Sequence, residues 1–162
     1  MKGIKKMKTL IVYGSKYGYA QSCAEELKGK IKGDVTVASA KQKIRSVEEY
    51  DNVLLGGSIY MTMPNKHIKA FAKKHLKALM GKKVGLFLCC GGVERWEEFL
   101  AKTFPAELIE SAYAKECFGG KMNKENMSGF HKKIVEMIEK DESQPPMKSL
   151  EENIGKLAEK FS

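Results

Sequence analysis

The chain has 162 residues and a formal net charge of +9, from 29 Lys and Arg against 20 Asp and Glu. This length fits one domain over residues 1–162, and a hydrophobic content of 43% excludes disordered and fibrous proteins. Because Arg45 and Arg95 are the only arginines and the lysines are dispersed, we expect a solvated basic surface, no nucleic-acid partner, and attraction to anionic ligands or surfaces.

The cysteines Cys23, Cys89, Cys90 and Cys117 form no C-x-x-C pair, which argues against a zinc site or a disulfide framework. We therefore expect buried thiols in a reducing, cytoplasmic compartment. The longest uncharged stretch, residues 52–65, is shorter than the roughly 18 residues that suggest a membrane helix, so no integral membrane segment is predicted.

The first third of the chain alternates strand and helix patterns. A short apolar run with β-branched residues predicts a strand over residues 8–13, and apolar side chains at helical spacing predict a helix over residues 20–31. A second strand is expected over residues 35–38. A capping box at residues 46–49 indicates a short helical turn before a third strand over residues 52–57.

The rest of the chain continues the alternation. We predict a loop over residues 58–65, a helix over residues 68–79 and a strand over residues 84–90. A helix over residues 93–100 and a strand over residues 112–118 follow. A helix near residues 130–138 and a polar linker over residues 141–147 then precede a last helix over residues 150–161, with Ser149 as its N-cap. Alternating βα units imply an α/β fold with a five-stranded parallel sheet between two helical layers.

Small residues follow four of the five predicted strands. They are Gly14-Ser15, Gly56-Gly57-Ser58, Gly91-Gly92 and Gly119-Gly120. Ligands of open parallel sheets bind beyond the carboxyl ends of the strands, and small residues let the backbone approach a flat ligand there. We therefore expect a ligand site at this edge of the sheet.

The segment from Gly14 to Ala20 joins the first strand to a helix N-terminus, where unpaired N–H groups and the helix dipole form an anion site. Its glycine spacing matches neither G-x-G-x-x-G nor G-x-x-x-x-G-K-[ST], which disfavours dinucleotides and nucleoside triphosphates. With the hydroxyl of Ser15 and the charge of Lys16, the segment suits a single phosphate.

These residues resemble a known family. Residues 13–20, followed by Glu25-Glu26-Leu27, are similar to the phosphate loop of flavodoxin-like proteins, although Ala20 lacks a frequent second hydroxyl and Tyr17 stands where threonine is frequent. Residues 57–60 and 118–122 resemble the branch that includes menaquinone-dependent protoporphyrinogen oxidase and uncharacterised flavodoxin-domain proteins.

The resemblance implies a flavodoxin-like three-layer sandwich with strand order 2-1-3-4-5 and noncovalently bound FMN. In the phosphate loop, the implied cofactor-binding residues are Ser15, Lys16, Tyr17, Gly18, Tyr19 and Ala20. In the two loops on either side of the isoalloxazine ring, they are Ser58, Ile59, Tyr60, Met61, Thr62, Cys90, Gly91, Gly92 and Val93. Tyr60 is the candidate for packing on the ring, because an aromatic face stacks well on a flavin.

The implied function is that of an FMN-binding redox protein, active in electron transfer or as an FMN-dependent oxidoreductase, with a redox protein, a small molecule or a quinone as partner. Two alternatives stay open: a protoporphyrinogen-oxidase-type enzyme that passes electrons to a quinone, and a flavodoxin-fold interaction or anion-binding module without flavin. No catalytic side chain or metal ligand is predicted, because His67, His75 and His131 lie in separate segments without ligand spacing.

The semiquinone of such a flavin is expected to be poorly stabilised. Many flavodoxins use a glycine after the third strand, whose flipped peptide bonds the flavin N5–H, and residues 58–64 contain no glycine. The net charge of +9 also favours the anionic reduced flavin. We therefore predict mainly two-electron behaviour.

Overall fold

The computed structural model describes residues 6–120, 129, 132–133, 136–137 and 149–162. The linker predicted over residues 141–147 and most of the helix predicted near residues 130–138 lie outside the described residues.

One sheet of six strands forms the centre of the molecule, with the order β2-β1-β3-β5-β6 and with β4 paired to β3. The strands are β1 (Lys8–Gly14), β2 (Asp34–Ser39), β3 (Asn52–Tyr60), β4 (Met63–Pro64), β5 (Lys83–Cys89) and β6 (Ala114–Cys117). All neighbouring strands pair in parallel except β4, which is antiparallel to β3. The predicted order of the five parallel strands is therefore confirmed, and β4 is an addition to it.

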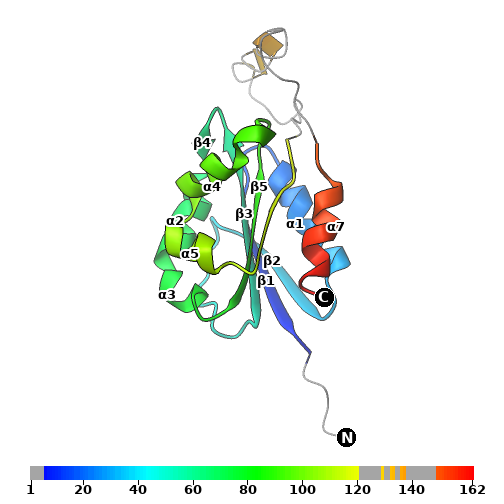
Figure 1. The fold of residues 1–162 in the computed structure, drawn as a ribbon, viewed down its shortest axis with the longest axis vertical. Helices are drawn as coiled ribbons and strands as arrows, with labels where there is room; N and C mark the ends of the chain where they lie inside the picture. Colours follow the sequence, from blue (N-terminus) through cyan, green and yellow to red (C-terminus); the bar gives the residue numbers. More distant parts are fainter. Residues whose placement is uncertain (1–5, 121–128, 130–131, 134–135, 138–148) are drawn as a thin grey trace, which may run out of the picture.

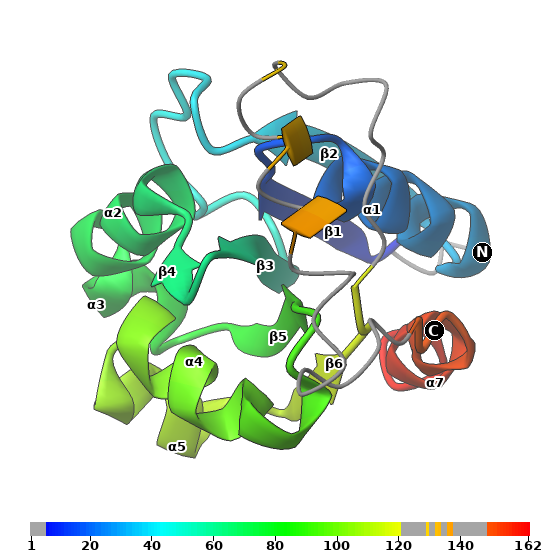
Figure 2. The ribbon, with the colours of Figure 1, turned by 90° about the horizontal axis from the view of Figure 1, so that it is seen from above.

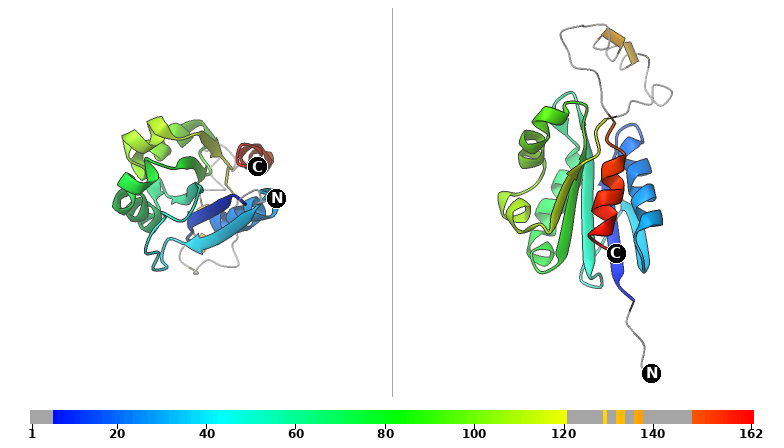
Figure 3. Two further views of the ribbon diagram at one scale, coloured as in Figure 1. Left: turned by 90° about the horizontal axis from the view of Figure 1, so that it is seen from below. Right: turned by 45° about the vertical axis from the view of Figure 1, so that its right-hand side comes forward.

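Helices cover both faces of the sheet, as Figures 1 and 2 show. One face carries α2 (Lys66–Lys74), α3 (Leu76–Leu79), α4 (Trp96–Thr103) and α5 (Ala106–Ser111), with the 3₁₀ turn Val93–Arg95 leading into α4. The other face carries α1 (Tyr19–Lys30) and α7 (Glu152–Glu159), which lie side by side (Figure 3). The predicted three-layer α/β sandwich is confirmed.

Two apolar cores form because successive strand residues point to opposite faces of the sheet. In β1, Leu10 and Val12 pack in the core under α2 to α5, whereas Ile11 packs in the core under α1 and α7. In β3, Leu55 packs in the core under α2 to α5, and Leu54 packs in the core under α1 and α7. Strands covered on both faces contain near-continuous apolar runs, which is why β1, β3 and β5 are readable from the sequence.

Several predicted elements differ in detail from the structure. The helix predicted over residues 68–79 is interrupted at His75, which ends α2 and precedes α3. At residues 46–49 the chain forms a single turn rather than a longer helix: the Ser46 hydroxyl accepts the Glu48 N–H at 3.0 Å, and the Tyr50 N–H bonds to the Val47 carbonyl oxygen at 3.1 Å. The strand predicted over residues 112–118 is shorter in the structure, where α5 ends at Ser111 and β6 spans Ala114–Cys117.

The prediction of Ser149 as the N-cap of the last helix is wrong. Glu151 is the N-cap of α7, and Ser149 forms an antiparallel bridge with Gly119 after β6. The Ser149 Oγ lies 3.4 Å from the Tyr19 Oη. A tertiary contact near the end of the sheet therefore determines the conformation of Ser149.

The stacked pair Phe87 and Phe118 makes Gly56 intolerant of a side chain. The two rings are fully buried with centroids 4.9 Å apart, and a Cβ on Gly56 would meet the Phe87 ring at 2.0 Å. We expect Gly56→Ala to lower the free energy of unfolding by about 1–3 kcal/mol, because a core this dense must shift to accept a methyl group. Chemical denaturation monitored by circular dichroism measures the change.

Gly29→Ala is the matched control for this substitution. Gly29 lies in α1, and a Cβ there would meet nothing within 4 Å. Alanine in a helix is more stable than glycine by about 0.5–1 kcal/mol, so this variant should be slightly more stable than the parent. A Gly56→Ala variant as stable as the parent would contradict the packing described for Phe87.

Candidate functional site

A pocket lies at the carboxyl ends of the parallel strands, on the edge of the sheet that Figure 2 views from above. The chain leaves β1 toward β2 on one side and later returns to add β3 on the other, so the strand order switches at β1. Such a switch point is where ligands of open α/β sheets bind. This strand-end pocket is lined by Ser15, Lys16, Tyr17, Tyr19, Ser58, Ile59, Tyr60, Cys89, Cys90, Gly91 and Gly120.

The loop over residues 15–18 brings the N-terminus of α1 to the pocket. Gly18, the N-cap, has φ 97° and ψ −10°, a left-handed conformation that favours glycine. The Ser15 Oγ accepts the Gly18 N–H at 2.9 Å and so holds the loop closed on itself. Side-chain geometry and backbone conformation therefore cooperate to turn the chain from β1 into the helix.

The N-terminus of α1 has the electrostatics of an anion site. No side chain caps the helix, and its first turn carries no acidic residue. The α2 N-terminus differs, because the Asn65 Oδ1 accepts the N–H groups of His67 and Ile68 at 3.0 and 3.2 Å. Uncapped N–H groups at the positive end of a helix dipole suit a phosphate or another small anion.

Two tyrosines and a lysine lie together at the mouth of the strand-end pocket. The Lys16 Nζ is 4.2 Å from the centroid of the Tyr60 ring, and the Tyr17 ring meets the Tyr60 ring edge-on at 5.4 Å. Desolvation, and next its hydrogen bond with Tyr60, raise the pKa of Tyr17 to about 12. Tyr17 therefore stays neutral near pH 7 and adds no negative charge beside the anion site.

The free volume inside the strand-end pocket is about 40 Å³ with these side chains in place. A tricyclic ring requires more space, which Lys16 and Tyr60 would provide by moving outward. Lys16 is exposed and Tyr60 half-buried, so neither is locked in a core.

Two glycines, Gly91 and Gly120, form part of the pocket wall. A Cβ on Gly120 would lie 2.9 Å from both the Cα and the N of Gly91, so these two loops approach each other as bare backbone. Ser58, another lining residue, donates its hydroxyl to the Gly14 carbonyl oxygen at 3.4 Å. Once Lys16 and Tyr60 move outward, this combination of backbone wall, aromatic face and uncapped helix suits a flat ligand with an anionic tail.

The segment after β3 is a hairpin where the sequence predicts a loop. Met61 and Thr62 form its turn with φ 50° and 66°, and β4 returns along β3. The Met61 and Met63 side chains are 50% and 66% exposed. Left-handed φ values are costly for residues with a Cβ, most of all for β-branched threonine.

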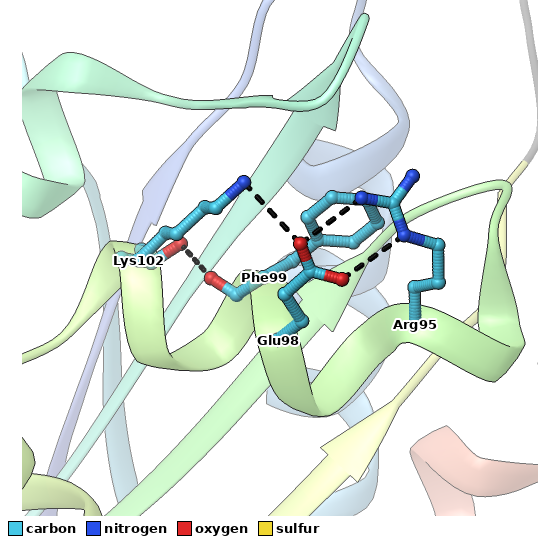
Figure 4. A network of polar contacts seen from close by, with 5 residues as sticks. Arg95, Glu98, Phe99 and Lys102 are labelled. Atoms are coloured by element: carbon cyan, nitrogen blue, oxygen red, sulfur yellow. Dashed lines mark hydrogen bonds and ion pairs between the residues drawn. The ribbon is translucent and has the colours of Figure 1, made fainter.

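Arg95, which follows the lining residue Gly91 by four positions, pairs with an acidic side chain outside the pocket lining. Arg95 donates to both carboxylate oxygens of Glu98 at 3.0 Å, and Lys102 lies 3.5 Å from the same carboxylate (Figure 4). This hydrogen bond with Arg95 lowers the pKa of Glu98. Of the residues that line the strand-end pocket, Lys16 is the cationic one.

All four cysteines are buried with free thiols, as expected. They form two close pairs, one in each core: Cys23 and Cys89 have their Sγ atoms 3.8 Å apart, and Cys90 and Cys117 have theirs 3.7 Å apart. Cys89 and Cys90 also line the strand-end pocket.

The structure brings most of the predicted cofactor-binding residues to the strand-end pocket. Those that line it are Ser15, Lys16, Tyr17, Tyr19, Ser58, Ile59, Tyr60, Cys90 and Gly91. Gly18 shapes the loop without lining the pocket, and Ala20 is fully buried in the core under α1.

The other predicted residues lie outside the lining. Met61 and Thr62 are exposed at the hairpin turn, and Gly92 and Val93 lie beyond Gly91 at the start of the 3₁₀ turn. Cys89 and Gly120 are additional lining residues. The sequence could have indicated Gly120, because the Gly119-Gly120 pair follows the last predicted strand, where a ligand site is expected.

A second cavity of about 480 Å³ lies beside β2, lined by Leu10 of β1 and by residues of β2 and of the segment 42–50. Its walls carry charges of both signs, from Lys43, Arg45, Glu48 and Glu49. It lacks the strand-end glycines and the helix N-terminus of the first pocket.

Within the described part of the chain, no group of three or more His, Cys, Asp or Glu is placed to hold a metal ion. None of the helices described is both long and apolar enough to cross a membrane.

The sheet order, the two helical layers and the pocket at the strand switch define a protein of the flavodoxin-like α/β class. The chain belongs to the flavodoxin domain family, whose pattern residues 10–149 match. A comparison with curated proteins gave no match.

Solved structures of the same fold include several flavodoxins. Oxidised flavodoxin 1 from Bacillus cereus is 15% identical, with 95% of this chain and 96% of that chain covered and a TM-score of 0.55. Two-electron reduced Megasphaera elsdenii flavodoxin is 18% identical over 93% and 98% of the two chains, with a TM-score of 0.54. A short-chain flavodoxin associated with a non-canonical PDU bacterial microcompartment is 14% identical over 96% of each chain, with a TM-score of 0.58.

Proposed function

We propose that this chain is an FMN-binding redox protein that carries electrons between partners in the cytoplasm. The observation that carries the proposal is the uncapped N-terminus of α1 opening into a pocket at the strand switch of a flavodoxin-domain protein. The partner proposed is a redox protein, or a small-molecule or quinone acceptor. Among the residues that the structure describes, no side-chain group favours a dedicated enzyme over a carrier.

The phosphate of FMN would be held by the loop over residues 15–18 and the first turn of α1. Backbone N–H groups would supply most of the hydrogen bonds, so the absence of a hydroxyl at Ala20 costs little. The Ser15 hydroxyl already accepts the Gly18 N–H and therefore shapes the loop. Lys16 would balance the charge of the phosphate dianion from the side of the pocket.

The isoalloxazine ring would lie between Tyr60 and the backbone wall formed by Gly91 and Gly120. Tyr60 offers an aromatic face that Lys16 covers in this structure, and the glycines leave room for a flat group against the opposite wall. Bound FMN would supply one- and two-electron redox chemistry. The protein would bind and orient the ring and limit its access to water.

Purification of the native protein tests the proposal. A yellow protein that releases FMN on denaturation, and whose apoprotein binds added FMN stoichiometrically, is the expected result. A colourless protein that does not bind added FMN would contradict the proposal and would favour a flavodoxin-fold module that functions without flavin. Full reduction and reoxidation of the bound flavin by a small-molecule mediator would establish the redox function.

A further inference from the structure

Cys90 and Cys117 come together at the carboxyl ends of two neighbouring parallel strands. Cys117 ends β6 opposite Leu88 of β5, so Cys90 lies two residues further along on the same face of the sheet. Their Sγ atoms are 3.7 Å apart, and both side chains belong to the core under α2 to α5. A disulfide bond is about 2.05 Å long, so a shift of less than 2 Å joins them.

The surroundings of this pair differ from those of Cys23 and Cys89. The hydrogen bond from Cys90 lowers the pKa of Cys117 although burial opposes it, and the Gly119 N–H adds to the lowering. Burial raises the pKa of Cys89 well above the usual range. The Cys90–Cys117 pair thus contains a thiol whose pKa is lowered by its neighbours, whereas in the other pair burial acts on Cys89 in the opposite direction.

Cys90 also connects its pair to the ligand site, because it lines the strand-end pocket beside Gly91. Cys117 lies behind it, away from the lining. A pair with one sulfur in the lining of a redox cofactor site and a second sulfur of lowered pKa behind it has the arrangement of a dithiol that exchanges electrons through the pocket-lining sulfur.

We propose that Cys90 and Cys117 form a reversible dithiol–disulfide couple that exchanges an electron pair with FMN in the strand-end pocket; this inference rests on the proposed function. On oxidation the two S–H bonds break and one S–S bond forms. The two thiols lose two electrons and two protons, and oxidised FMN gains two electrons and two protons. The reverse exchange breaks the S–S bond, reforms the two thiols and oxidises the dihydroflavin.

The roles of the two sulfurs follow from their positions. In the reducing direction, Cys90 is the sulfur that faces the pocket, and Cys117 departs from it as a thiolate. A thiol with a lowered pKa leaves faster in such exchanges. Cys117 then takes up its proton, and the hydrogen bond between the two thiols is restored.

The dithiol can be tested without any flavin. The apoprotein is equilibrated anaerobically in buffers of reduced and oxidised dithiothreitol, alkylated, digested with trypsin and analysed by mass spectrometry. We expect a disulfide between the peptides of residues 84–95 and 116–121, with no disulfide in the Cys117→Ala variant. Because residues 84–95 contain both Cys89 and Cys90, the Cys89→Ala variant must keep the link and Cys90→Ala must lose it. Four free thiols across all buffers would overturn the proposal.

Exchange with FMN is tested by anaerobic reductive titration of the oxidised, FMN-loaded protein. We expect about four electrons taken up per FMN in the parent and in the Cys23→Ala control, and about two in Cys117→Ala, because each disulfide and each flavin accepts two. Uptake of two electrons by a parent protein with a demonstrated disulfide would overturn the exchange but leave FMN binding intact. Failure to bind FMN would overturn the proposed function and the exchange together, while the dithiol is judged by the flavin-free experiment.

Discussion

Gly18→Ala is expected to weaken FMN binding about tenfold. Gly18 is the N-cap of α1 and has φ 97°, a conformation that costs a residue with a Cβ about 1–2 kcal/mol. An alanine loop relaxes away from this conformation, and FMN must restore it in order to reach the N–H groups of the helix. A cost of about 1.4 kcal/mol corresponds to a tenfold change in affinity. Titration of the apoprotein, followed by quenching of FMN fluorescence, measures the change.

Gly155→Ala is the control for this loop substitution. Gly155 lies in α7, where a Cβ would meet nothing within 4 Å. Its affinity for FMN should equal that of the parent protein. If Gly18→Ala also bound FMN with the affinity of the parent, the loop over residues 15–18 would not be the phosphate site.

Thr62→Gly is expected to increase the amount of semiquinone during reduction. The parent should show little, because the hairpin turn contains no glycine whose peptide can rotate toward the flavin, and because the net charge of +9 favours the fully reduced anion. Thr62 has φ 66°, so glycine both relieves strain of about 1–2 kcal/mol and frees the peptide. A stabilisation of about 1.4 kcal/mol would raise the semiquinone formation constant tenfold. Anaerobic titration with absorbance spectra measures the semiquinone.

Thr62→Ala separates the effect of removing the β-branched side chain from the effect of a glycine peptide that can rotate toward the flavin. Alanine removes the β-branch but keeps a Cβ at positive φ, so the semiquinone should increase much less than with glycine. A parent protein that already accumulates a large, stable semiquinone would contradict the expectation for this turn.

The sheet and its layers were predictable because their signals are local. Strands such as β1 and β3 are covered on both faces, and their apolar runs are readable without knowledge of the partners. The hairpin that contains β4 was missed because Met61 and Thr62 adopt a turn conformation that usually requires glycine or asparagine. The contact of Ser149 with Tyr19 joins residues far apart in the sequence, so the helical pattern around Ser149 pointed to a cap that the fold does not use.

The candidate site was predictable where it depends on strand ends, as with Ser15, Ser58 and Gly91. Topology alone brings such residues to one edge of a parallel sheet. The contact between Lys16 and Tyr60 and the pairing of Cys90 with Cys117 depend on side-chain positions in three dimensions. Spacing along the chain carries no signal for either.

The claim that the N-terminus of α1 holds a phosphate is tested by comparing the affinities of the apoprotein for FMN and for riboflavin. The two ligands share the ring and the ribityl chain and differ in the phosphate alone. Two charge-assisted hydrogen bonds contribute about 3 kcal/mol or more, so FMN should bind at least about 100-fold more tightly. Equal affinities for the two flavins would contradict the claim.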